Sequence, residues 1–200
     1  MRYEPDYKAK TRQKVLGEAA KVMRTEGIQG MGVANVMAKA GLTHGAFYAH
    51  FESKDALIAE TIKEMALLAR GKFDAVTADL DPADALRAYI DFYLSARHRD
   101  SVQTSCPLPW IAAEVTRLGD AAQNSYGASV AGLTDRLATR LRALDRADAD
   151  AAASSVVAEL VGALALSRAV ADKAQSDLIL SRSRDSVIAR LGLAPAAPKA

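Results

Sequence analysis

A short polar stretch at residues 43–54 carries the side chains whose types and spacing are best suited to chemistry. It reads Thr-His-Gly-Ala-Phe-Tyr-Ala-His-Phe-Glu-Ser-Lys. Its hydroxyl, imidazole and phenol groups can donate hydrogen bonds to phosphate oxygens or base edges, and its small residues let a helix N-terminus approach a duplex closely. The stretch therefore predicts contact with double-stranded DNA. The candidate DNA-binding residues are Thr43, His44, Gly45, Ala46, Tyr48, His50 and Lys54.

Each of these residues also has an ordinary structural interpretation. Tyr48 could be a half-buried core residue, and His44 and His50 could be plain surface residues. Two histidines six positions apart do not suit a metal site on one helix, because helical ligands are spaced by three or four residues. The sequence therefore predicts no metal site, and it is the ordered string of residues, not any single one, that favours DNA.

The residues before this stretch predict two helices that would position it. Apolar residues spaced by three and four predict one helix at about residues 8–26 and a second at about residues 33–40. Gly41 permits the left-handed backbone of a tight turn. Thr43 then suits the N-cap of a short third helix at about residues 44–50. Two helices joined by such a turn are typical of a helix-turn-helix.

The rest of the chain has the pattern of long amphipathic helices. No stretch shows the alternation of β-branched residues that strands require, so the expected fold class is all-α with about nine helices. We expect an N-terminal three-helix helix-turn-helix domain at residues 1–53, a larger helical domain at 54–193 and a disordered tail at 194–200. The further helices are expected at about residues 54–77, 81–98, 106–117, 121–144, 149–171 and 177–191, with a polar break at 99–105.

Composition is that of an ordinary soluble protein. Half of the 200 residues are hydrophobic and a quarter are charged. No apolar run reaches the roughly 18 residues that a membrane span needs, and the N-terminus lacks the apolar core of a signal peptide. We therefore expect a cytoplasmic protein with no membrane partner. The single cysteine, Cys106, excludes an internal disulfide framework and a multi-cysteine metal site.

The net charge of +2 conceals an uneven distribution of charge. Residues 1–55 hold nine Lys or Arg against six Asp or Glu, whereas the remaining residues hold 17 against 18. A basic N-terminal part on a neutral body fits phosphate attraction at one end, but a solubilising tail or a solvated helix face would have the same charge. The local basic cluster in this part consists of Lys8, Lys10, Arg12 and Lys14.

One ordered set of residues matches the pattern of a known family. The set is Gly27, Val33, Val36, Ala40-Gly41-Leu42-Thr43, Gly45, Phe47-Tyr48, Phe51, Ser53-Lys54 and Leu57. Through it, residues 12–58 resemble the N-terminal domain of the TetR family of bacterial transcriptional regulators. The resemblance implies that Thr43 to Tyr48 contact the DNA groove and that Tyr48 and Lys54 contact phosphates. One departure is Met31-Gly32, where the family usually has Ser or Thr, so a side-chain cap of the second helix is lost.

The last two expected helices are candidates for a dimer interface. Their apolar faces could form a four-helix interface with a second copy, or could simply be buried inside one subunit. A dimer would allow a small DNA-reading domain to contact two half-sites about 34–36 Å apart or more. The resemblance to the family favours the dimer. The candidate interface residues are Val157, Leu160, Val161, Leu164, Val187, Ile188 and Leu191.

Most of the remaining aromatic residues fall in the middle helices. Aromatic side chains with polar tips can line a small-molecule pocket, but at helical spacing they are also ordinary core residues. The resemblance implies a cavity for an unidentified small-molecule inducer, whose binding would lower the affinity for a DNA operator. The candidate pocket residues are Phe73, Tyr89, Phe92, Tyr93, Cys106, Trp110 and Tyr126.

Cys106 precedes Pro107 at the expected start of a helix, and three cationic or titratable residues precede it in the sequence. These are Arg97, His98 and Arg99. A helix dipole and nearby cations can stabilise a thiolate, which would suit a thiol that senses electrophiles or oxidants. The alternative is a small buried hydrophobic residue at the entry to a helix.

The sequence contains no nucleophile motif, glycine-rich phosphate loop or metal-ligand spacing. We therefore expect no catalytic residues, no cofactor and no enzyme activity. The leading prediction is a homodimeric transcriptional repressor that a small-molecule or electrophile inducer releases from a palindromic operator. A helical adaptor or structural dimer is the main alternative, and a small-molecule-processing enzyme is a weaker one. Salt-sensitive DNA binding would distinguish a transcriptional regulator from the adaptor and from the enzyme.

Overall fold

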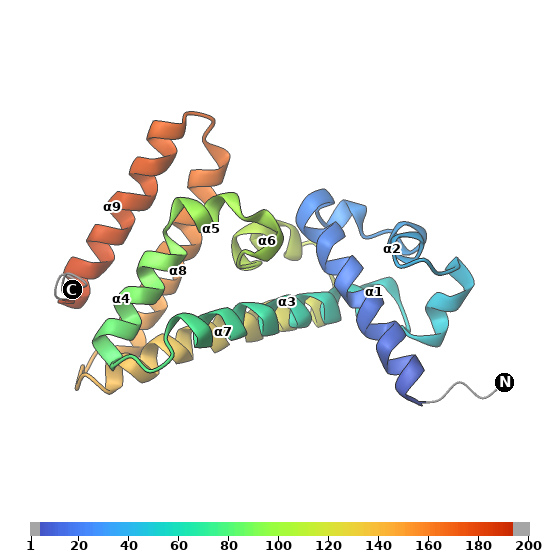
Figure 1. The fold of residues 1–200 in the computed structure, drawn as a ribbon, viewed down its shortest axis with the longest axis horizontal. Coiled ribbons are helices and arrows are strands. Elements are labelled where there is room, and N and C mark those ends of the chain that lie inside the picture. The colour runs from blue at the N-terminus through green and yellow to red at the C-terminus, as the bar shows by residue number, and fades with distance from the viewer. Residues whose placement is uncertain (1–4, 194–200) are drawn as a thin grey trace. The chain divides into compact units, whose positions relative to one another are not determined.

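The computed structural model describes residues 5–193, and every regular element in that range is a helix (Figure 1). This confirms the all-α fold class. The expected tail at 194–200 lies outside the described residues. The α-helices are α1 (Pro5–Glu26), α2 (Val33–Lys39), α3 (Lys54–Val76), α4 (Pro82–Tyr93), α5 (Ala96–Asp100), α6 (Leu108–Val115), α7 (Asp120–Arg142), α8 (Ala149–Ala169) and α9 (Lys173–Leu191). Short 3₁₀ helices span Ile28–Gly30, His44–Ala49 and Val102–Thr104.

Local sequence signals set most of the helix ends. Gly27 ends α1 with φ of 67°, and Gly41 makes the tight turn after α2 with φ of 70°, a backbone region that glycine enters without steric penalty. The Ser53 hydroxyl caps α3 by accepting a hydrogen bond from the Ala56 N–H at 3.0 Å. Asp81 caps α4 in the same way through two backbone N–H groups. These signals lie within a few residues of the ends they control, so they are visible in the sequence.

The middle of the chain differs from the sequence-based expectation. The single helix expected at 81–98 ends at Tyr93, and α5 starts two residues after Leu94. Ser95 causes the break, because its hydroxyl accepts a hydrogen bond from the His98 N–H at 3.1 Å and caps a new helix. The residues expected as a polar break therefore hold the end of α5 and a short 3₁₀ helix.

The chain packs as two compact units. Among the described residues, the first unit comprises residues 5–68 together with Cys106–Ser129, and the second comprises Ala69–Ser105 together with residues 130–193. The boundaries therefore fall inside α3 and α7. The division by function at residue 53, which the sequence predicts, stays a prediction. The packing shows that α6 belongs to the same compact unit as the helix-turn-helix.

One apolar cluster holds the first unit together. It combines buried residues of α1, α2 and the 3₁₀ helix after the turn with buried residues of α3, α6 and the start of α7. The rings of Phe47 and Phe51 stack with centroids 5.6 Å apart, so the four-residue spacing anchors that 3₁₀ helix to the core. Burying each such ring stabilises the fold by roughly 2 kcal/mol. Members of the cluster include Met23, Val36, Met37, Phe47, Phe51, Ile62, Ile111 and Ala122.

In the second unit, α8 and α9 lie side by side (Figure 1). Leu160 and Leu164 of α8 and Val187 of α9 are completely buried there. Within residues 5–193, α8 is also the one helix whose length and composition would allow it to cross a membrane. The core helix of a soluble protein meets the same criteria of length and composition, and α8 has the buried apolar side of such a core helix.

Candidate nucleic-acid interface

The segment after the tight turn is a 3₁₀ helix, His44–Ala49, rather than the α-helix that the sequence predicts. Thr43 occupies the N-cap position, but its side chain makes no capping hydrogen bond. Gly45 in the first turn adds backbone freedom that opposes an α-helix. Because neither a cap nor helix propensity stabilises this segment, the burial of Phe47 is what fixes it to the core. We call residues 43–50 the reading segment.

Phe47 and Tyr48 divide the reading segment into an inner and an outer side. The Phe47 side chain is 1% exposed and the Tyr48 side chain 70% exposed, and their rings meet edge to face with centroids 5.2 Å apart. The His44 ring lies 6.5 Å from the Tyr48 ring. An exposed phenol beside an exposed imidazole can donate hydrogen bonds to a phosphate or a base edge. The other exposed candidates are Thr43, Gly45 and Lys54.

Two of the candidate residues, Ala46 and His50, are less accessible than the rest. Ala46 is half-buried and packs against the apolar cluster. The His50 side chain is also half-buried, and its Nδ1 has no hydrogen-bond partner among residues 5–193. Burial lowers the pKa of His50, and the positive charges of Lys8 and Arg12 lower it further. His50 is therefore less suited to a charged contact with phosphate than the sequence suggests, and its role stays a prediction.

Arg12 belongs to the basic cluster of the sequence, but the structure engages it inside the first unit. Its guanidinium pairs with Glu60 of α3, donates from Nε to the His50 carbonyl oxygen at 3.3 Å, and lies 4.9 Å from the centre of the Phe51 ring. Arg12 thus ties α1 to α3 and to the end of the reading segment. Sequence reasoning missed this role because Glu60 is 48 residues away. The exposed members of the basic cluster are Lys8, Lys10 and Lys14.

The start of α2 has no side-chain cap, as Gly32 in place of Ser or Thr implies. Asn35 contributes hydrogen bonds nearby, because its Nδ2 donates to the Gly30 carbonyl oxygen and to Glu26 Oε2, both at 2.9 Å. Lys39 pairs with Glu26 at 3.0 Å. The hydrogen bonds from Lys39 and Asn35 lower the pKa of Glu26. These partly exposed contacts hold α2 to the end of α1 with modest strength.

Glu114 of α6 reaches the connection between α1 and α2. Its carboxylate accepts a hydrogen bond from the Ile28 N–H at 2.9 Å. A Cβ added at Gly27 would lie 3.3 Å from the same carboxylate, so both the positive φ and the close approach favour glycine there. The helix-turn-helix is therefore positioned in part by a residue 86 positions further along the chain.

Two family models match this chain. Residues 15–61 match the model for bacterial regulatory proteins, tetR family. Residues 82–179 match the model for the transcriptional regulator LmrA/YxaF-like, C-terminal domain. The chain belongs to the TetR family. Both matches describe transcriptional regulators rather than enzymes.

Individual relatives support the same assignment. The HTH-type transcriptional regulator LmrA of Bacillus subtilis is 30% identical over 82 residues, a match that covers 40% of this chain and 44% of that protein. This chain therefore matches less than half the length of that relative. The reduced form of NemR from Escherichia coli has a TM-score of 0.78 at 18% identity, with 89% of this chain and 95% of that chain covered. A TetR-family regulator from Cytophaga hutchinsonii has a TM-score of 0.79 at 22% identity, covering 93% and 97%. These structural likenesses confirm the fold.

The aromatic residues predicted to line a pocket in this TetR-family chain fall into two groups. Phe73, Tyr89, Phe92 and Tyr93 belong to the second unit, and Cys106, Trp110 and Tyr126 belong to the first. In the second unit, the ring of Tyr89 lies 4.4 Å from that of Phe73, 6.2 Å from that of Phe92 and 5.7 Å from that of Tyr93. In the first, the Tyr126 hydroxyl donates to the Leu108 carbonyl oxygen at 3.3 Å. Their shared role in one pocket stays a prediction.

Cations and a neutral histidine surround the aromatic group of the second unit. The Arg140 guanidinium lies 4.7 Å from the centre of the Phe73 ring. The His98 ring stacks on Phe92 at 4.9 Å, and its Nδ1 donates to the Tyr93 carbonyl oxygen at 2.8 Å. Burial lowers the pKa of His98 to about 4, so this ring is neutral near pH 7.

Most residues predicted for the dimer interface are buried within the chain. Val157, Leu160, Leu164, Val187 and Leu191 are all buried, and Val161 and Ile188 are half-buried. The large apolar residues that stay exposed on α8 and α9 are Leu166 and Leu178. The predicted set therefore serves mainly to fill the interior of one chain, which is the alternative that the sequence left open. Its contribution to a dimer stays a prediction.

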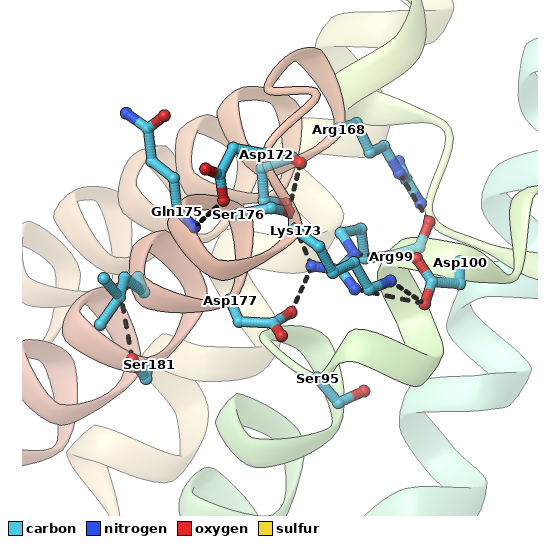
Figure 2. A network of polar contacts seen from close by, with 12 residues as sticks. Ser95, Arg99, Asp100, Arg168, Asp172, Lys173, Gln175, Ser176, Asp177 and Ser181 are labelled. Atoms are coloured by element: carbon cyan, nitrogen blue, oxygen red, sulfur yellow. Dashed lines mark hydrogen bonds and ion pairs between the residues drawn. The ribbon is translucent and has the colours of Figure 1, made fainter.

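Arg99 is the centre of a polar network that joins α5 to α8 and α9 (Figure 2). The side chain is 4% exposed, and it pairs with Asp100 at 2.8 Å and with Asp177 at 2.6 Å. Its Nη1 also donates to the Ser176 hydroxyl at 2.7 Å. Arg168 of α8 donates to the Arg99 carbonyl oxygen at 3.1 Å. The hydrogen bond from Arg99 is the main reason why the pKa of Asp100 falls to about 2.

Proposed function

We propose that this protein is a cytoplasmic homodimeric repressor that binds a palindromic operator through the reading segment and is released by a small-molecule or electrophile inducer. The observation that carries the DNA-binding assignment is the contrast between Phe47 and Tyr48. A buried phenylalanine anchors the segment, and the adjacent tyrosine is 70% exposed. A large aromatic residue exposed in this way is suited to packing against sugar and phosphate.

The charges around the reading segment support a phosphate-binding role. Lys54 is exposed at the first position of α3 and has no ion pair among the residues the structure describes. Thr43, His44 and Tyr48 add groups that can donate hydrogen bonds on the same exposed segment. We therefore assign groove contacts to residues 43–48 and phosphate contacts to Tyr48 and Lys54.

A dimer would double the length of DNA that this small unit can read. Two copies related by a two-fold axis would bind half-sites about 34–36 Å apart or more, and the operator would be an inverted repeat. Leu166 on α8 and Leu178 on α9 are large apolar side chains left exposed, and a second copy would cover them. The half-buried Val161 and Ile188 would lie at the edge of that contact.

The inducer would act by binding one arrangement of the protein better than the other. Linkage requires that a ligand which lowers operator affinity binds the DNA-free arrangement more tightly by the same factor. The two aromatic groups, around Tyr89 and around Trp110, are the sites we assign to such a ligand.

The decisive experiment is recovery of genomic DNA fragments by the purified protein at two salt concentrations, followed by sequencing. We expect one inverted repeat that survives the higher salt, because base contacts add to the phosphate attraction that salt screens. Recovery of no sequence, or of random fragments that salt removes, would contradict sequence-specific regulation and favour a helical adaptor.

Variants of the reading segment test the site with the recovered sequence. Tyr48→Ala and Lys54→Ala should each weaken operator binding at least about tenfold without changing the fold. Lys63→Ala removes an exposed lysine further along the same helix and is the matched control. Normal binding by a folded double variant of Tyr48 and Lys54 would remove the site assignment.

A further inference from the structure

Two arginines of α7 lie over one buried aromatic ring of α3. The guanidinium carbon of Arg136 is 5.8 Å from the centre of the Phe73 ring, and that of Arg140 is 4.7 Å from it. Both arginines are half-buried, and all three residues belong to the second compact unit. The two positive charges are therefore held one helical turn apart, where like charges repel each other and destabilise a helix.

One carboxylate serves three arginines at this place. Each oxygen of Asp74 on α3 faces a different arginine, with the Nε of Arg70 and the Nε of Arg136 both 3.8 Å away. These distances are too long for hydrogen bonds. Arg140 has no carboxylate within ion-pair distance among residues 5–193. Three cations against one carboxylate leave a local charge of +2.

A neighbouring arginine of α7 shows what ordinary surface pairing looks like in this protein. Arg142 is two positions after Arg140, and its guanidinium has two carboxylates as partners, those of Asp135 and Asp150. Arg140 is the less exposed of the two arginines and yet lacks such a partner. The shortage of negative charge is therefore specific to the cluster over the aromatic ring.

The contacts of the two half-buried arginines leave donors for another molecule. Arg140 donates from Nη2 to the Thr77 hydroxyl at 3.3 Å and from Nη1 to the Arg136 carbonyl oxygen at 3.4 Å. Arg136 donates from Nη1 to the Gly132 carbonyl oxygen at 3.3 Å. The Nε of Arg140 and the Nη2 of Arg136 have no partner in the part of the chain that the structure describes. An aromatic ring attracts the face of a guanidinium, so its edge stays available to a ligand.

We propose that Arg136 and Arg140, together with Arg70, bind a doubly charged oxyanion of a small molecule, either a phosphate monoester or a dicarboxylate. Guanidinium groups bind phosphate and carboxylate oxygens in their own plane through parallel N–H donors. A phosphate monoester carries about 1.5 to 2 negative charges at neutral pH, which matches the local charge. The bound anion relieves the repulsion between the two arginines of α7.

The anion site adjoins the aromatic group around Tyr89, because Phe73 belongs to both. The Tyr89 and Phe73 rings are 4.4 Å apart. The site thus names acidic small molecules as the class of the inducer and favours this group over the one around Trp110. Arg70 lies on α3, the helix that begins at Lys54, so a ligand that draws Arg70 towards α7 acts on a helix that carries a proposed phosphate contact. The inducer role rests on the proposed function, whereas anion binding can be tested without DNA.

The first test is isothermal titration calorimetry of the full chain at constant ionic strength. The probes are phenyl phosphate, the dicarboxylate phthalate and, as the uncharged control, phenol. We expect one of the two dianions to bind and phenol not to bind. Arg136→Met and Arg140→Met should each weaken binding at least about tenfold, because each removes charge-assisted hydrogen bonds. Arg142→Met, on the same helix and outside the cluster, should bind like the wild type.

The probe that binds identifies the source of the oxyanion, and the arginine variants decide the site. Binding of neither dianion would overturn the proposal, as would binding that Arg136→Met and Arg140→Met leave unchanged. If these variants fail to fold, the native protein decides the question through modification by phenylglyoxal, which reacts with arginine. The dianion should protect Arg136 and Arg140 and leave Arg142 unprotected, as mapped by mass spectrometry of peptides. Equal modification with and without the dianion would equally overturn the site.

The second test measures binding to the recovered DNA sequence with the dianion present, against chloride at the same ionic strength. We expect the dianion to lower the affinity of the wild type at least about fivefold and to leave Arg140→Met unaffected. Saturation of the site without a change in DNA affinity would overturn the inducer role. Failure of the ligand-free protein to bind any DNA would instead count against the proposed function, and calorimetry would still decide the anion site.

Discussion

The reading segment in the first unit and the Arg99 network in the second use polar residues in opposite ways. Tyr48 and Lys54 keep their polar groups on the surface, whereas Arg99 is buried and holds two carboxylates and a hydroxyl. A buried polar group needs partners inside the chain, because an unsatisfied one destabilises the fold. A polar group left exposed on a well-anchored segment retains its hydrogen-bonding capacity for another molecule. The difference separates polar residues that serve the fold from those that we propose to contact DNA.

The same contrast occurs among the basic residues of α1. Lys8 and Lys14 are exposed, whereas Arg12 pairs with Glu60 and packs over Phe51. Arg24 is buried as well, and its Nε has no hydrogen-bond partner among the residues that the structure describes. Four cations on one helix thus have three different environments. The charge of a residue alone therefore does not indicate whether it contacts DNA.

The largest expected effect is on the free energy of unfolding, and it comes from the buried residue His98. Its pKa is about 4 in the folded chain, mainly because of burial, against 6.5 in the unfolded chain, so the unfolded chain binds the proton first as the pH falls. The stability that His98 contributes is complete above about pH 6.5 and is lost by about pH 4, with a total near 3 kcal/mol. Urea unfolding across this range measures it. His98→Phe should flatten the slope, and an unchanged slope would contradict the assignment.

Arg99→Met should have the next largest effect. It removes one hydrogen bond to the Ser176 hydroxyl and the ion pairs with two half-exposed carboxylates, of which Asp100 keeps Lys173 as a partner. We expect a loss of about 2 kcal/mol in the free energy of unfolding. Arg97→Met removes an exposed arginine two positions earlier and should change stability by less than about 0.5 kcal/mol. Equal effects of the two substitutions in urea unfolding would remove the distinction between buried and exposed cations.

Gly27→Ala tests how α6 positions the helix-turn-helix. The substitution forces a side chain into φ of 67° and brings Cβ to 3.3 Å from the Glu114 carboxylate, so we expect a loss of about 1–2 kcal/mol. Gly17→Ala, within α1 and with open space around it, should instead stabilise by about 0.5–1 kcal/mol. Thermal unfolding of both variants measures the difference. A stabilising Gly27→Ala would show that the close approach is not required.

The smallest expected effect compares Arg12 with Lys54 through the salt dependence of DNA binding. Lys54→Gln should reduce the slope of log K against log salt by about 1, because it would remove the phosphate contact that we propose for Lys54. Arg12→Gln should lower the affinity at every salt concentration and leave the slope nearly unchanged, because Arg12 acts inside the protein. A reduced slope for Arg12→Gln would place Arg12 on the DNA instead.

Local patterns in the sequence were sufficient for the fold class, the approximate helix positions and the exposed part of the reading segment. Helix ends depend on caps and glycines a few residues away, as at Ser53 and Gly27, and amphipathic spacing identifies Phe47 and Phe51 as anchors. Local reasoning was wrong where a nearby residue competed. Ser95 starts a new helix inside a continuous apolar pattern, and the segment at 44–49 forms a 3₁₀ helix instead of an α-helix.

The tertiary structure alone decided which residues are partners. Arg12 pairs with Glu60 and Glu114 with Ile28, over 48 and 86 residues, and no periodicity or motif encodes such pairs. It also decided that most of the apolar faces of α8 and α9 are buried within one chain. The physical reason is that a helix pattern specifies which side of a helix is apolar, whereas long-range packing specifies what covers that side.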